Sequence, residues 1–223
     1  MNLKNSWWKI LALVLIAYSI VAGFIVEVPV LPVIGQTIRN VFFHVGMWFV
    51  MIIIMGVSFV YSLKYLSGFT MKNDIYAAEA ANVAMLFGIL GICTGMLWAR
   101  ATWGVFWVRD PKLDGAAVGL LIYFAYFILR GSLDEEQKRA RISAVYNIFA
   151  FILLILFLII LPRLAKESIH PGKDANPVLP MNLDPNMRIV FYPAIVGWIM
   201  LSVWILHLRV RYAQLKKKLE SLK

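Results

Sequence analysis

The sequence predicts an all-α integral membrane protein with six transmembrane helices and with both termini in the cytoplasm. Two features of the composition support this prediction: 61% of the 223 residues are hydrophobic and only 15% are charged, whereas soluble domains contain about 25% charged residues. The third observation is that six stretches are apolar over the roughly 20 residues that a spanning helix needs. We therefore expect the apolar residues to face lipid or the interior of a helical bundle.

The predicted spans have apolar residues on all sides, which is typical of helices in a bilayer or a bundle. The first span resembles a signal peptide, because Lys4 and Lys9 stand at the start of its apolar run. However, this apolar run is long, and no small-x-small cleavage site precedes Glu27. We therefore expect an uncleaved first span, and residues 1–223 are expected to form a single six-helix transmembrane domain. The six spans are Trp8–Val26, Phe42–Leu63, Ala81–Trp98, Leu113–Leu129, Ile142–Leu161 and Ile189–Leu208.

The distribution of charged residues orients the chain. With the N-terminus inside, 14 of the 22 Lys and Arg residues lie in inner segments and 8 in outer ones, while the 12 acidic residues divide evenly. This is the positive-inside bias, so the net charge of +10 indicates membrane topology, with contact to anionic lipid, and not nucleic-acid binding. The single cysteine excludes an internal disulfide and a CxxC site.

This orientation places two notable segments on the outer face. The first is a tryptophan-rich loop at residues 99–112, between the third and fourth spans. The second is a loop at residues 163–187, which contains His170 and four prolines. Loops of this length without periodicity are often functional or disordered. The inner segments "KYLSGFTMKNDIYAAE" and "RGSLDEEQKRAR" are expected to be ordinary solvated connectors.

The stretch "WARATWGVFWVRDPKLD" concentrates aromatic and charged residues at the outer membrane surface. Asp110, which is followed by a proline, is a favourable N-cap for the fourth span. Trp103, Phe106 and Trp107 stand at positions i, i+3 and i+4, so they share one face if the segment is helical. Two interpretations remain open: an aromatic belt that anchors the helices at the interface, or a platform that binds a flat ligand beside cations.

The three histidines favour a binding platform. His44 lies just inside the outer end of the second span, where an ionisable residue is a functional candidate. His170 lies on the same side, whereas His207 lies at the inner end of the sixth span and is expected to be an interfacial residue. Each outer histidine taken alone is also compatible with an ordinary hydrogen-bonded role. Together they fit haem, which needs imidazoles for its iron, aromatic rings for the porphyrin faces and arginine for its propionates.

At these residues the sequence resembles the CcmC/CcmF/CcsA family, the haem-handling membrane proteins of cytochrome c maturation, which have a tryptophan-rich outer loop. Arg109 stands where the family has a second late tryptophan, and Phe106 stands where some members carry an additional one. A histidine flanks the motif on each side, as in the family. Six spans, two outer histidines and a short cytoplasmic tail are similar to the CcmC members. The pattern WG-x-x-W-x-W-D-x-x-L is matched at Trp103, Gly104, Trp107, Asp110 and Leu113.

The resemblance implies a function and a set of site residues. It implies that the chain binds haem b at the periplasmic side of a bacterial inner membrane, with His44 and His170 as the metal ligands. It further implies delivery of the haem to the membrane-tethered chaperone CcmE, beside CcmB, the ATPase CcmA and the small protein CcmD, without enzymatic activity. The motif residues implied to contact haem are Trp103, Gly104, Phe106, Trp107, Arg109 and Asp110.

Two other functions remain open. One is a haem b electron-transfer membrane anchor of a quinol oxidoreductase; such anchors commonly hold haem between histidines of two spans, whereas His170 lies in a loop. The other is a small-molecule membrane transporter, which often has carboxylates within its spans, whereas Glu79 and Asp114 lie at span boundaries. A hydrolase has no support, because no nucleophile–base–orienter set is visible.

Overall fold

The computed structural model describes residues 6–165, 168–170 and 183–222. Within these residues, six helical segments are long and apolar enough to cross a membrane, so the predicted all-α fold with six membrane-spanning helices is confirmed, while the cytoplasmic location of the termini stays a prediction. Most of the helices extend beyond the predicted spans. The long helices are α1 (Trp7–Ile25), α2 (Val41–Gly68), α3 (Met71–Trp103), α4 (Pro111–Gly131), α5 (Glu136–Ile155) and α7 (Pro185–Glu220).

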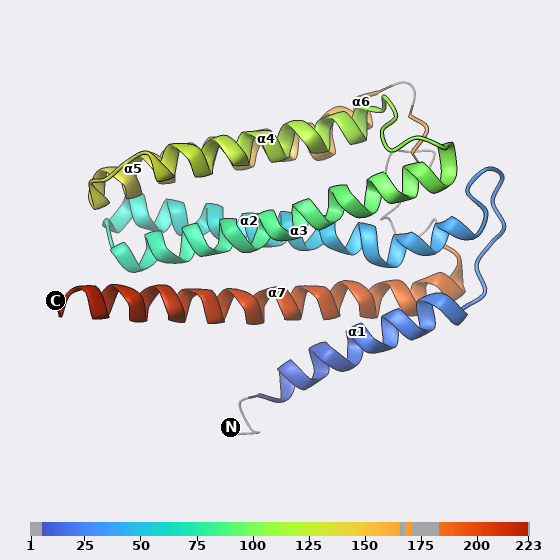
Figure 1. Cartoon of the computed structure of the whole chain (residues 1–223), viewed down its shortest axis with the longest axis horizontal. Helices are drawn as coiled ribbons and strands as arrows, with labels where there is room; N and C mark the ends of the chain where they lie inside the picture. Colours follow the sequence, from blue (N-terminus) through green and yellow to red (C-terminus); the bar gives the residue numbers. More distant parts are fainter. Residues whose placement is uncertain (1–5, 166–167, 171–182, 223) are drawn as a thin grey trace.

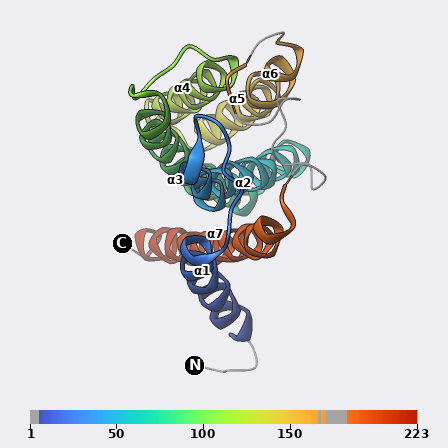
Figure 2. The ribbon, with the colours of Figure 1, turned by 90° about the vertical axis from the view of Figure 1, so that its right-hand side faces the viewer.

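The long helices form three antiparallel pairs that stack as layers (Figure 1). α2 and α3 make up the middle layer, with α4 and α5 packed on one side and α7 and α1 on the other. The middle pair carries much of the core, including the fully buried Met51, Ile54 and Ala84. α1 packs on α7 at the edge of the bundle (Figure 2) and is the least buried of the six spans. Most of its apolar surface is therefore left for lipid.

The first inner connector differs from the prediction, because it is almost entirely helical. α2 and α3 are separated only by Phe69 and Thr70. Asp74, which was expected on a solvated connector, is 5% exposed and accepts two hydrogen bonds from the guanidinium of Arg130, at 2.8 and 2.7 Å. The expectation of a solvated connector is therefore wrong here, since a buried ion pair allows a carboxylate to lie inside the bundle.

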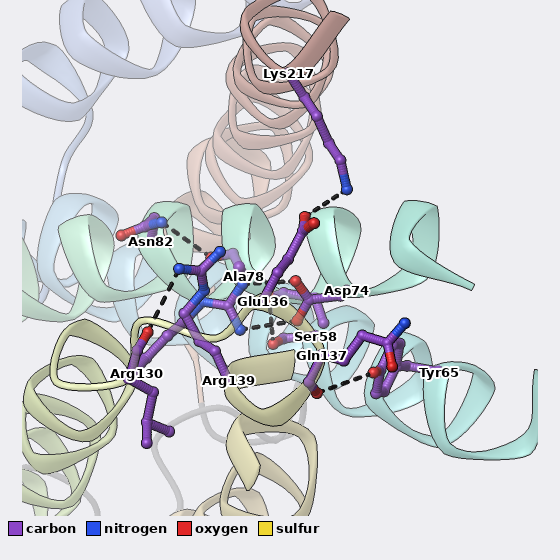
Figure 3. A network of polar contacts seen from close by, with 12 residues as sticks. Ser58, Tyr65, Asp74, Ala78, Asn82, Arg130, Glu136, Gln137, Arg139 and Lys217 are labelled. Atoms are coloured by element: carbon purple, nitrogen blue, oxygen red, sulfur yellow. Dashed lines mark hydrogen bonds and ion pairs between the residues drawn. The ribbon is translucent and has the colours of Figure 1, made fainter. Parts of the chain in front are cut away.

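Ion pairs between helices accumulate at this end of the bundle (Figure 3). The buried pair just described connects α3 to α4. Lys217 of α7 donates to Glu136 of α5, and Arg209 of α7 lies 2.5 Å from Glu79 of α3. The last two pairs are more exposed and each contributes little. The buried pair matters more, because the loss of one partner leaves an uncompensated charge in the protein interior.

The fifth span changes its winding near its C-terminal end. After α5 the chain forms a π-helical turn, η3 (Leu156–Ile160), and then the short helix α6 (Leu161–Leu164). Pro162 explains the change, because it has no N–H to donate and its ring crowds the preceding turn. Gly115 of α4 packs against the widened turn, where a Cβ atom would overlap the carbonyl oxygen of Phe157. This close approach brings the outer ends of the fourth and fifth spans together.

Candidate functional site

The end of the bundle that is predicted to face outward contains a cavity of about 300 Å³. Its walls come from α2, α3, α4, the end of the fifth span and the segment 168–170. The predicted site residues that line it are His44, Trp103, Trp107 and His170. Further aromatic and basic lining residues are Trp48, Phe49, Trp98, Lys112 and Arg163. The cavity therefore combines two imidazoles, several indole rings and two cations.

His44 is held in place between α2 and α3. It is buried, and its Nδ1 lies 3.0 Å from the carbonyl oxygen of Gly91 and 3.1 Å from Oγ1 of Thr94. A carbonyl oxygen only accepts, so this contact favours the tautomer with the proton on Nδ1 and the lone pair on Nε2. A hydrogen bond from the second ring nitrogen is the device that orients metal-binding histidines. Nε2 of His44 is thus prepared to act as a ligand.

His170 reaches the same cavity from the connection between the fifth and sixth spans. Its Nδ1 is buried and has no hydrogen-bond partner among the described residues. Burial, followed by the charges of Lys112 and His44, lowers the pKa of His170 to about 3. The imidazole is therefore neutral at physiological pH, which is the form that binds metal ions.

The two imidazoles are spaced for one shared metal. Their ring centroids are 6.4 Å apart, with 46° between the ring planes. A metal bound by both rings would separate the centroids by roughly 6 Å, since each metal–nitrogen bond is about 2 Å and the ring radii add to it. Among the described residues, no group of three or more His, Cys, Asp or Glu could hold a metal. Two imidazoles suit a metal whose remaining ligands come from a macrocycle better than a four-ligand zinc site.

The tryptophan-rich loop is shorter than predicted, because α3 continues through Trp103. Gly104 ends the helix with a φ of 80°, in the left-handed region that favours glycine. Residues 104–110 are therefore not helical, so the condition for one shared helical face is not met, although Trp103 and Trp107 both line the cavity. Phe106 does not line it; it is 50% exposed and lies beside the guanidinium of Arg100.

The second predicted outer loop, residues 163–187, is also shorter than predicted, because helices take up both of its ends. α6 covers its beginning and α7 starts at Pro185. Residues 166–167 and 171–182, with three of the four prolines, lie outside the described residues. The described part of the loop that reaches the cavity is therefore the segment 168–170.

Asp110 connects the tryptophan-rich loop to the segment that carries His170. Its Oδ1 accepts a hydrogen bond from the N–H of Lys112, so the predicted N-cap of α4 is confirmed. Its Oδ2 accepts from Oγ of Ser168 at 2.8 Å and from the N–H of Ile169 at 2.9 Å. Burial by itself would raise the pKa of Asp110, but these three hydrogen bonds bring it below its ordinary value. The ionised carboxylate of Asp110 thus binds both the start of α4 and the segment 168–170.

The sequence matches one known family along nearly its whole length. The profile of the family described as CcmC, Heme exporter protein C, matches residues 2–223. The chain belongs to the CcmC family. The resemblance inferred from the tryptophan motif and from the six spans is therefore confirmed.

Individual relatives of this CcmC-family chain are distant. Heme exporter protein C of Bradyrhizobium diazoefficiens is 30% identical over 114 residues, which cover 51% of this chain and 43% of that protein. Heme exporter protein C of Escherichia coli strain K12 is 23% identical over 189 residues, or 79% of this chain and 70% of that protein. Cytochrome c biogenesis protein CcsA of Pelargonium hortorum is 29% identical over 93 residues, or 41% of this chain and 29% of that protein. The matched part thus spans less than half of the Bradyrhizobium relative.

Arg109, at which this chain departs from the tryptophan pattern of the CcmC family, is not brought to the cavity. It is exposed and forms no ion pair among the residues that the structure describes. The cations that line the cavity are Lys112 in the first turn of α4 and Arg163 in α6. Sequence reasoning missed both, since neither belongs to the motif.

Two further tryptophans, Trp48 and Trp98, were also missed. Their ring centroids lie 6.3 and 5.7 Å from that of His44, both edge-on. Trp48 follows His44 by four residues, which places it on the same face of α2 and was the available signal. Small residues of α3 allow the approach: a Cβ atom at Gly95 would lie 2.7 Å from Cε1 of His44, and one at Gly91 2.9 Å from Cε2 of Trp48.

Replacement of Asp110 by alanine tests its double role. We expect Asp110→Ala to lower the free energy of unfolding by about 1 to 2 kcal/mol through the lost cap, and to speed hydrogen exchange at the Ile169 amide. The matched control is Asp184→Ala, because Asp184 caps α7 through the N–H of Asn186 at 2.8 Å. Thermal unfolding should shift in both variants, whereas exchange at Ile169 should change only in the first. Equal exchange in the two variants would contradict the assigned link.

Proposed function

We propose that this chain binds haem b at the outer face of a bacterial inner membrane and delivers it to the chaperone CcmE during c-type cytochrome biogenesis. CcmB, CcmA and CcmD are the proposed partners, and the chain acts by binding and presentation without catalysing a reaction. The names of its relatives, Heme exporter protein C and cytochrome c biogenesis protein CcsA, support the ligand and the process. The charge bias of the sequence supports a cavity that faces the periplasm.

The observation that carries the proposal is the convergence of His44 and His170 on one aromatic cavity. Haem supplies an iron with two open axial positions and four nitrogens of its own. His44 would provide one axial nitrogen from a buried helix, with its tautomer fixed by Gly91. His170 would provide the other, using an imidazole that is neutral at physiological pH.

The remaining lining residues fit the rest of the haem molecule. Flat indole faces, including those of Trp103 and Trp107, suit a flat macrocycle. Lys112 and Arg163 are the cations placed to bind its two carboxylates. In this proposal Lys112 and Arg163, and not Arg109, bind the carboxylates, because Arg109 does not line the cavity.

The attachment of the second histidine supports delivery of haem over fixed electron transfer. His44 belongs to a buried helix, whereas His170 belongs to a segment that is fastened by hydrogen bonds to Asp110. An electron-transfer anchor benefits from two rigid ligands, because its haem stays in place. A carrier instead needs one ligand that detaches without disturbing the helices.

A small-molecule transporter has less support than a haem carrier. The two carboxylates considered for such a role both have partners, because Glu79 pairs with Arg209 and Asp114 accepts a hydrogen bond from Nε1 of Trp107. Neither is therefore a free acidic group that could bind a transported cation.

The proposed function is tested by the haem content of purified protein. We expect Trp103→Ala with Trp107→Ala to weaken haem binding about thirtyfold, since each of the two aromatic contacts is worth about 1 kcal/mol, and to reduce transfer to CcmE. Phe106→Ala is the matched control, because Phe106 lies in the same loop but outside the cavity. Haem per protein and transfer should both be measured.

The opposite result would identify a membrane belt. In that case the double variant would lower the abundance of the protein while leaving haem per protein and transfer at the wild-type level.

A further inference from the structure

A second pocket, of about 480 Å³, lies at the other end of the bundle, between the start of α1 and the inner part of α7. α1 diverges from α7 toward its N-terminal end (Figure 1, Figure 2), and the pocket lies in the resulting wedge. Its aromatic and basic lining residues are Trp8, Lys9, Tyr76, Trp204, His207 and Arg211. We infer that this pocket binds the phosphate group of an anionic phospholipid.

The two cations of this pocket are not paired with a carboxylate in the part of the chain that the structure describes. Lys9 and Arg211 form no ion pair among the described residues, and residues 1–5, which precede Lys9, contain no Asp or Glu. Neighbouring cations of the same end behave differently, since Arg209 and Lys217 are both paired with glutamates. The pocket is therefore a place of positive potential, which attracts an anion.

Aromatic rings hold one of these cations in position. The Nζ of Lys9 lies 5.3 Å from the ring centroid of Trp204 and 5.8 Å from that of Trp8. A cation–π contact orients an ammonium group without neutralising it. His207 packs edge-on against Trp8, with 5.9 Å between centroids. Lys9 is thus pre-positioned to meet a ligand.

The position of the pocket identifies a lipid as the source of the anion. The apolar run of α7 ends at Leu208, and the apolar run of α1 begins at Trp7, so the pocket lies where hydrocarbon gives way to headgroups. Tryptophan is enriched at this level of a membrane. Basic pockets between transmembrane helices on the cytoplasmic side bind anionic headgroups. A phospholipid places its phosphate beside the cations and its acyl chains against the exposed apolar surface of α1, including Ile10 and Val14.

The inference is tested with full-length protein that has been freed of lipid in a neutral detergent. The midpoint of thermal unfolding is measured during titration with phosphatidylglycerol, phosphatidylcholine or inorganic phosphate, and the shift gives an apparent dissociation constant. We expect phosphatidylglycerol to bind at least about tenfold more tightly than phosphatidylcholine, and inorganic phosphate to leave the midpoint unchanged. Lys9→Gln with Arg211→Gln should weaken phosphatidylglycerol binding at least about tenfold, given the contribution of each cation near a headgroup.

The matched control is Lys216→Gln with Lys218→Gln, which removes the same charge from α7 outside the pocket. This control should change the affinity by less than about twofold. Equal losses in the two double variants, or equal affinity for the two lipids, would overturn the site. Competition by inorganic phosphate at the same concentration as the lipid would instead reassign the pocket to a soluble anion and overturn the lipid. If the first double variant does not fold, Lys9→Gln and Arg211→Gln are tested singly, each with an expected loss of about fivefold.

Discussion

Replacement of both His44 and His170 by alanine is expected to remove the Soret band of haem from the purified protein. Each histidine is a proposed axial ligand, and loss of even a residue that merely orients a metal ligand costs about 10- to 100-fold in affinity. Each single variant should therefore bind haem at least tenfold more weakly or change its spectrum from six-coordinate to five-coordinate. Absorption spectra and haem per protein, measured after purification from haem-replete cells, check this expectation.

His207→Ala is the matched control, because His207 lies at the other end of the bundle, against Trp8. Its haem content should equal that of the wild-type protein. Thermal unfolding of all variants separates loss of a ligand from loss of the fold. A wild-type Soret band in the double variant of His44 and His170 would rule out these residues as the ligands.

Asp74→Asn is expected to lower the free energy of unfolding by about 3 to 5 kcal/mol, because it leaves the guanidinium of Arg130 without its buried counter-charge. The double variant that also carries Arg130→Met should be less destabilised than the sum of the two single variants. Unfolding in mixed detergent micelles measures the difference.

The control for this pair is Glu136→Gln, since Glu136 pairs with Lys217 where both side chains are roughly half exposed. Its expected cost is below about 1 kcal/mol. Equal destabilisation by Asp74→Asn and Glu136→Gln would show that the burial of the Asp74–Arg130 pair does not contribute as assigned.

The number and order of the spans were predictable, because hydropathy over a window of the sequence decides whether a helix enters a bilayer. The ends of the helices were not predictable in the same way. α3 begins ten residues before its predicted apolar run, and this polar first part is stabilised by Arg130 and Arg209, which come from distant parts of the chain. Such pairings leave no local pattern in the sequence.

The residues of the candidate site also fall into those that the sequence predicted and those that it did not. His44 and Trp103 stood out because ionisable and tryptophan residues are informative at the end of a span, and both line the cavity. Lys112 and Arg163 did not stand out, because their place depends on how α4 and the π-helical turn before Pro162 pack over the middle layer. That packing depends on Pro162 and on the contact of Gly115 with the backbone carbonyl of Phe157. In the sequence, neither a proline nor a glycine at these positions indicates that a ligand binds nearby.

The two carboxylate oxygens of Asp110 bind different parts of the chain: one caps helix α4, and the other binds the segment that carries His170. Oδ1 keeps α4 capped by accepting from the N–H of Lys112, while Oδ2 accepts from Ser168 and Ile169, which lie beside His170 in the sequence. Detachment of the segment that carries His170 from Asp110 therefore breaks two hydrogen bonds to a charged group, which cost roughly 3 to 6 kcal/mol in total. Because this cost is several times the thermal energy, the two hydrogen bonds would slow the movement of the segment that carries His170, and in the proposed carrier they would lengthen the time for which a ligand is retained.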